Sequence, residues 1–178
     1  LKDEFGSRVI AVEASECPTM LENGFGEHNI QGIGDKHVPL IHNVMNTDVV
    51  VGVSDRSTNA LGVLFNTEAG QSFLRDRKGW SPELVQTMSR FGFSGLCNTL
   101  AAIKTAKKLR TGADQAFITV ATDGWPLYAS EEDHIVQSLG GSFDALTPAE
   151  VYGPHWRGVS EEHGEALTPP RPPPPVPL

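Results

Sequence analysis

The chain of 178 residues is 39% hydrophobic and 20% charged, the composition of a globular protein long enough to bury a hydrophobic core. Its net charge of −8 comes mainly from residues 131–178, where two Lys or Arg residues stand against eight Asp or Glu residues. This charge balance provides no basic stripe that could bind a nucleic-acid backbone, so we expect no nucleic-acid partner. No apolar run is long enough to span a membrane, so we expect no membrane partner either. Cys17 and Cys97 lack CxxC spacing, and no signal peptide is visible, which favours a reduced, cytoplasmic setting.

The first predicted elements are a helix end and a short turn that lead into a strand at residues 8–13, "RVIAVE". Further β-branched runs at 48–53 and 117–122 also predict strands. None of the three runs alternates strictly between polar and apolar residues, which is typical of strands buried on both faces of a parallel sheet. The predicted fold class is therefore α/β, with an open parallel sheet flanked by helices.

Between the first two strands, residues 28–39 read "HNIQGIGDKHVP". Gly32 and Gly34 allow backbone conformations that other residues disfavour, and Pro39 prevents a continuous helix, so the segment is predicted to be a shaped loop. Such a loop can bring its backbone close to a small ligand.

A metal site is the alternative for this loop, with His28, Asp35, His37 and His42 as the candidate ligands. His37 and His42 are five positions apart with a proline between them, so they do not share a helical face as the HExxH pattern requires. We therefore favour the ligand loop and predict no metal.

Helices are predicted for three segments between the second and third predicted strands. Residues 54–76 should form one or two helices after Ser54, with a break near Gly70. Residues 81–92 should form a short helix, with Ser81 as its N-cap and Pro82 at its first position.

The longest predicted helix covers residues 94–112, because apolar residues recur along one side and lysines gather near its C-terminus. Gly112 is expected to end it. By this interpretation Ser94 could be simply the N-cap of the helix.

Beyond residue 130 the pattern predicts a helix, a glycine turn and a short helix from Thr147. Trp125, Tyr128 and Trp156 are expected to be packing residues.

The last segment, 167–178, contains a proline run that favours an extended polyproline II tail. Its Arg171, Pro174 and Pro177 fit an RxxPxxP docking pattern. A disordered end is favoured over a recognition role.

Four of these segments, in fixed order, resemble one family: "RVIAVEASECPTM", "HNIQGIGDKHVP", "GFSGLCNTLAAIKTAKKL" and "FITVATDGWPLYAS". They are similar to the C-terminal half of the fold-type II pyridoxal-phosphate enzymes, the tryptophan synthase beta superfamily, and especially to cysteine synthase (O-acetylserine sulfhydrylase). The resemblance covers about residues 7–130, and the IQGIG loop is its most specific part. It implies part of a PLP-dependent enzyme at 1–130, a divergent helical extension at 131–166 and the proline-rich tail at 167–178, incomplete relative to the family's two-domain fold.

The resemblance also assigns roles to individual residues. Ser94 would hydrogen-bond the pyridine nitrogen of the cofactor, with Gly92 and Gly32 also at the cofactor. Gln31, Ile33 and Gly34 would line the substrate cleft. The sequence "GFSGLCN" departs from the family pattern, because Gly95 replaces a second serine and Leu96 replaces a glycine.

Two parts of the family's catalytic machinery have no counterpart in this sequence. These are the segment with the Schiff-base lysine and the glycine- and threonine-rich loop that holds the cofactor phosphate. Lys36, Lys78 and Lys104 do not have the local setting of that lysine, so we predict no catalytic residue here.

The resemblance therefore implies a fragment of a PLP-dependent enzyme for β-elimination or β-replacement on a serine- or cysteine-type amino acid. Alone it should be inactive, and we expect a homo-oligomer or association with a missing N-terminal half. The alternative is a non-catalytic α/β binding or interaction module.

Overall fold

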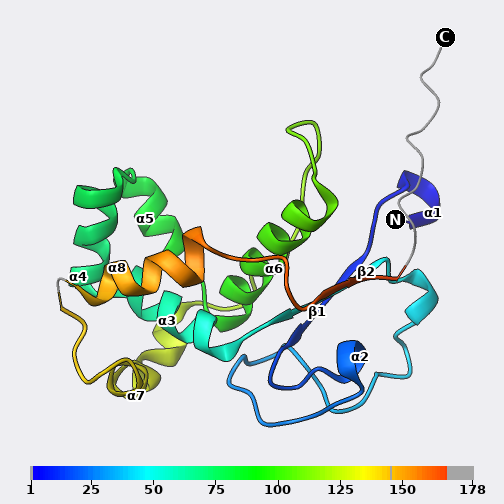
Figure 1. Ribbon diagram of the computed structural model, residues 1–178, viewed down its shortest axis with the longest axis horizontal. Helices are drawn as coiled ribbons and strands as arrows, with labels where there is room; N and C mark the ends of the chain where they lie inside the picture. Colours follow the sequence, from blue (N-terminus) through cyan, green and yellow to red (C-terminus); the bar gives the residue numbers. More distant parts are fainter. Residues whose placement is uncertain (1, 145, 168–178) are drawn as a thin grey trace.

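The computed structural model describes residues 2–144 and 146–167, so the docking pattern at Arg171, Pro174 and Pro177 lies outside the described residues. Its centre is a three-stranded sheet with the order β1-β2-β3 (Figure 1). β1 (Ile10–Ala14) runs parallel to β2 (Val49–Val53), with Ile10 opposite Val49. β3 (Gly164–Ala166) pairs antiparallel with β2, so the sheet is mixed, and the sequence analysis did not predict this third strand.

The strand predicted at 117–122 does not form. These residues form no regular secondary structure and lie outside the sheet, and Ile118 and Val120 are 98% and 63% exposed. The carbonyl oxygen of Val120 accepts a hydrogen bond from Asn98 Nδ2 instead of joining a ladder. β-branched residues favour a strand only where a neighbouring strand pairs with them, and within the described residues this segment has none.

The helices that follow β2 gather at one end of the sheet, whereas the short helices that precede β2 lie on the other side, beside the strands (Figure 1). In chain order they are α1 (Lys2–Phe5), α2 (Thr19–Glu22), η1 (Val44–Asn46), α3 (Asp55–Asn66), α4 (Glu68–Ser72), η2 (Phe73–Arg77), α5 (Pro82–Met88), α6 (Phe93–Leu109), η3 (Trp125–Glu131), α7 (Glu132–Ser138), α8 (Thr147–Tyr152) and η4 (Gly153–Arg157).

Local capping signals explain several of these boundaries. Ser81 caps α5 as predicted, because its side chain accepts a hydrogen bond from the amide of Leu84. The break predicted near Gly70 occurs at Thr67, whose side chain caps α4. α6 ends at Leu109, and its C-cap, Arg110, has the left-handed conformation two residues before the predicted Gly112.

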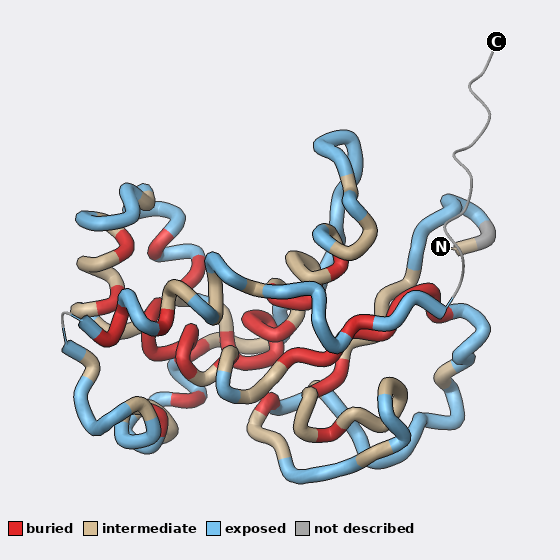
Figure 2. The backbone as a smooth tube through the Cα atoms, in the orientation of Figure 1, coloured by how far each residue is buried: buried red, intermediate tan, exposed pale blue. Residues whose placement is uncertain are grey.

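The core lies between β2, α3 and α6 and continues under the later helices (Figure 2). All five residues of β2 are buried, as the apolar run predicted. Ile135 and Val151, from the region beyond residue 130, belong to the same core cluster. The predicted packing role of Trp125 and Tyr128 is confirmed, because they are only 5% and 7% exposed.

An aromatic cluster joins the later helices to α3. Phe65 stacks on Trp80 and meets Trp156 edge to face, with ring centroids 5.9 Å and 5.4 Å apart. Trp156 thus has the packing role expected from the sequence.

No helix among residues 2–144 and 146–167 has the length and apolar character needed to cross a membrane.

Candidate functional site

The loop around residues 30–34 has the backbone conformation that its glycines predicted. Gly32 has φ of +77° and Gly34 has φ of +91°, in the region that favours glycine. Gln31 and Gly32 are exposed, while Ile33 is half-buried and packs against the core. Gln31 and Gly32 therefore face solvent, while Ile33 packs the loop against the core.

The start of α3 anchors this loop. The carboxylate of Asp55 accepts hydrogen bonds from the backbone amides of Asn29 and Ile30, the latter at 3.2 Å, and Ile30 is completely buried. The carboxylate of Glu16, just after β1, in turn accepts from the Ser54 hydroxyl and the Asp55 amide. Burial raises the pKa of Asp55 above its ordinary value.

A pocket of about 470 Å³ lies beside the loop and is lined by residues of 17–28 and by Gly34, Asp35 and Lys36. His28 contributes to its wall, and its Nδ1 is buried without a hydrogen-bond partner among the described residues. A β-carbon on Gly34 would lie 3.1 Å from His28 Nε2, so a larger residue would crowd the imidazole.

The four candidate metal ligands are not gathered. The side chain of His37 is 78% exposed, and His42 Nε2 contacts the Thr47 hydroxyl at 3.2 Å. Within the described part of the chain, no three His, Cys, Asp or Glu side chains are placed to hold a metal ion.

Ser94 is the second residue of α6, so it is not the helix N-cap that the sequence allowed; Gly92 occupies that position. The Ser94 side chain is buried, and its Oγ lies 2.8 Å from Thr122 Oγ1 and 3.4 Å from Asp123 Oδ1. The Tyr128 hydroxyl donates to the other oxygen of Asp123. Burial, together with this hydrogen bond, raises the pKa of Tyr128 to about 12, so the phenol remains a donor at neutral pH.

Gly92 must be a glycine for a packing reason. A β-carbon at this position would overlap the Asp123 carboxylate and would lie 2.7 Å from Tyr128 Cε2. Its amide also donates to the carbonyl oxygen of Asp123 at 3.2 Å. Gly92 thus allows α6 to begin directly against the segment 122–128.

Thr122, Asp123 and Tyr128 are not among the site residues predicted from the sequence. A signal was available, because Thr122 and Asp123 stand at the end of the run predicted as a strand, a common location of functional side chains in α/β proteins.

The structure divides the predicted site residues into two groups. Ser94 and Gly92 contact the segment 122–128, whereas Gly34 lines the pocket beside His28. Neither Ser94 nor Gly92 lines that pocket.

Three solved structures share this arrangement of elements. A hydrogen sulfide-producing enzyme from Fusobacterium nucleatum has 20% identity and a TM-score of 0.55, over 84% of this chain and 38% of its own. O-acetylserine sulfhydrylase isoform 3 from Entamoeba histolytica has 19% identity and a TM-score of 0.55, with the same coverage. An O-ureido-L-serine synthase has 15% identity and a TM-score of 0.51, over 84% of this chain and 40% of its own.

The chain has the fold of part of a cysteine synthase-like enzyme. The predicted resemblance is thereby confirmed at the level of the fold, and the chain spans 38–40% of the length of these structures. No family model matches the sequence, and neither does any curated protein.

Proposed function

We propose that this chain contributes to a pyridoxal-phosphate-dependent enzyme that eliminates or replaces the β-substituent of a serine- or cysteine-type amino acid. The observation that carries the proposal is the contact between the buried Ser94 hydroxyl, at the start of α6, and the exposed Thr122 hydroxyl, in a chain with a cysteine synthase-like fold.

The hydroxyl pair fits a pyridine nitrogen. A serine hydroxyl has one proton to donate and two lone pairs to accept with. At 2.8 Å either Ser94 or Thr122 can be the donor. When Thr122 donates to Ser94, the Ser94 proton is available for a ring nitrogen. The contact of Ser94 with Asp123, at 3.4 Å, is weak and can break when Ser94 donates to the ring.

When bound, pyridoxal phosphate supplies an electron-accepting ring that stabilises negative charge at the substrate Cα. Ser94 would keep its own proton while it donates a hydrogen bond, because an aliphatic alcohol is a very weak acid. A hydroxyl partner therefore leaves the ring nitrogen largely unprotonated, which favours β-elimination and β-replacement over transamination.

The loop would form part of the substrate cleft through Gln31, Ile33 and Gly34, with Gly32 next to the cofactor. No atom lies within 4 Å of a β-carbon built on Gly32, so its backbone can be approached closely. The anchor at Asp55 would keep Gln31 in position, because the two preceding residues are bonded to α3 through the amides of Asn29 and Ile30.

The proposal requires a Schiff-base lysine and a phosphate-binding loop from outside these 178 residues. We therefore expect activity only in an assembly that contains an N-terminal half, and a small amino acid as substrate.

The test replaces Ser94 with Ala in such an assembly. Cofactor should still bind, but β-elimination should slow about ten- to a hundredfold, roughly 1.4–2.7 kcal/mol of transition-state stabilisation. Steady-state rates and the absorbance of the bound cofactor measure the two effects separately. The matched control is Ser7→Ala, at an exposed position between α1 and β1.

Unchanged turnover in Ser94→Ala, accompanied by a lower free energy of unfolding, would mean that Ser94 only supports α6. The proposed cofactor contact would then be wrong.

A further inference from the structure

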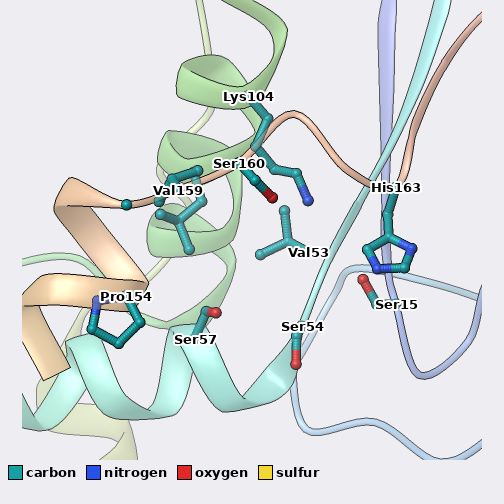
Figure 3. A pocket seen from close by; sticks show the side chains of 11 residues that line it. Ser15, Val53, Ser54, Ser57, Lys104, Pro154, Val159, Ser160 and His163 are labelled. Carbon is teal, nitrogen blue, oxygen red and sulfur yellow. The ribbon is translucent and has the colours of Figure 1, made fainter. Parts of the chain in front are cut away.

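A second pocket, of about 330 Å³, lies between β2, α3, α6 and the segment 158–163 (Figure 3). Its polar lining comes from Ser15, Ser54, Ser57, Lys104, Ser160 and His163. Neither Ser94 nor the loop 30–34 lines it, so it is separate from the proposed cofactor and substrate site.

Lys104 is the charged group of this pocket. It projects from α6 toward the end of β2, where its Nζ donates to the carbonyl oxygen of Gly52 at 2.7 Å (Figure 3). An ammonium has three protons, so two remain for other acceptors. No carboxylate of the described residues forms an ion pair with Lys104.

The surroundings of Lys104 disfavour its charged form. Burial lowers the pKa of Lys104, and the charge of Glu162 only partly opposes this shift. A half-buried ammonium without a paired carboxylate is stabilised when an anion binds beside it.

Further donors face the same space. The Ser15 hydroxyl and the His163 imidazole have no hydrogen-bond partner among the described residues, and Figure 3 shows the two side chains next to each other on one side of the pocket. The nearby acids do not line the pocket: Glu16 accepts bonds from Ser54 and Asp55, and Glu162 accepts one from Ser160. No carboxylate of the described residues lines the pocket, and the donors that remain available there are Lys104, Ser15 and His163, because Ser54, Ser57 and Ser160 already have partners.

The walls of the pocket are tied together. The amide of Gly52 donates to the carbonyl oxygen of His163 at 2.7 Å, and Lys107 Nζ donates to the carbonyl oxygen of Val159. These bonds hold the segment 158–163 against β2 and α6, so the pocket exists before a ligand arrives.

We propose that this pocket binds the oxyanion group of a small molecule, a carboxylate or a phosphate, through the ammonium of Lys104 with Ser15 and His163 as further donors. The volume admits a small organic anion, since one water molecule in the liquid takes about 30 Å³. Such a ligand would act on this chain independently of pyridoxal phosphate.

The test is a titration of the ¹⁵N-labelled full chain with inorganic phosphate and, separately, with acetate, against sodium chloride of equal ionic strength. We expect saturable amide shifts at Gly52, Ser54 and Ser160. Shifts with phosphate alone identify a phosphate-bearing ligand, and shifts with acetate identify the carboxylate class. Saturation with neither anion would overturn the proposal.

Lys104→Met removes the charge and keeps most of the side-chain length, so affinity should fall at least about tenfold, whereas Lys104→Arg should retain it. If Lys104→Met does not fold, Ser160→Glu serves instead, because it places a negative charge at an exposed position in the pocket wall and should also abolish binding. The control is Arg77→Gln, an exposed charge on η2. Equal affinity in the parent and in a folded Lys104→Met or Ser160→Glu chain would show that the anion binds elsewhere.

Discussion

His155, on η4, reaches the first turn of α3, where its Nδ1 lies 3.0 Å from Ser57 Oγ. The hydroxyl of Ser57 can donate to this nitrogen only when the imidazole is neutral. Burial lowers the pKa of His155, and the charge of Arg56 lowers it further. Both effects favour the neutral ring in the folded chain.

This residue predicts a dependence of stability on pH. Below the ordinary histidine pKa of about 6.5 the unfolded chain takes up a proton that the folded chain does not, so the free energy of unfolding should fall as the pH falls. His155→Gln should lose less stability than the parent between about pH 7.5 and pH 5.5. Urea unfolding at both values measures the difference.

The control for this prediction is His37→Gln, because the His37 side chain is 78% exposed. It should show the same pH dependence as the parent. An identical pH dependence in His155→Gln and in the parent would mean that burial of His155 has no energetic consequence.

At the scale of elements, one helix terminus organises the candidate loop. α3 begins at Asp55, whose carboxylate holds the amides of Asn29 and Ile30, while Glu16 holds the Asp55 amide. The loop glycines permit its shape, but the carboxylate at the start of α3 fixes its position. This explains how a segment without regular secondary structure can present Gln31 reproducibly.

We predict that Asp55→Ala loosens this loop. Two backbone donors lose their acceptor, and an unpaired buried donor costs about 1–3 kcal/mol. Hydrogen exchange at Asn29 and Ile30 should therefore accelerate at least about tenfold, while exchange in the middle of α6 should change much less.

Asp133→Ala provides the matched control, since it removes an exposed aspartate from the first turn of α7. It should leave exchange at Asn29 and Ile30 unchanged. If Asp55→Ala leaves this exchange unchanged as well, the contact with α3 does not hold the loop.

At the scale of the whole molecule, apolar surface remains uncovered. In the described sheet β1 has a neighbour on one side only, and the segment with Ile118 and Val120 lies outside the sheet. Leu40 and Ile41, beyond the candidate loop, are also almost completely exposed. Unpaired strand edges and exposed apolar side chains favour association with other chains.

We therefore predict that the chain self-associates at micromolar concentration, as sedimentation velocity would show. Ile118→Lys should reduce the associated fraction, because a charge on an apolar strand-like segment opposes pairing. Leu127→Lys is the control, since this residue is 73% exposed on η3.

Sedimentation as a compact monomer with a single cooperative unfolding transition would contradict this prediction. It would show that the chain closes its own core, and it would favour the non-catalytic binding module.

The sequence by itself determined the features that depend on neighbours in the chain. The positive φ angles of Gly32 and Gly34, the cap at Ser81 and the buried strand at Val49–Val53 follow from local sterics, local hydrogen bonds and a continuous apolar run. The motif order from the first strand to α6 was sufficient to indicate the fold that the solved structures share.

Only the tertiary structure decided which of these elements meet. It left the predicted strand at 117–122 unpaired, added β3 to β2, placed Thr122 and Asp123 against Ser94, and enclosed Lys104 in a pocket. The physical reason is that a strand needs a partner strand and a polar group needs a partner atom, and these partners lie tens of positions away in the chain. A hydroxyl or an ammonium acquires a chemical role from such partners, and local sequence patterns do not specify them.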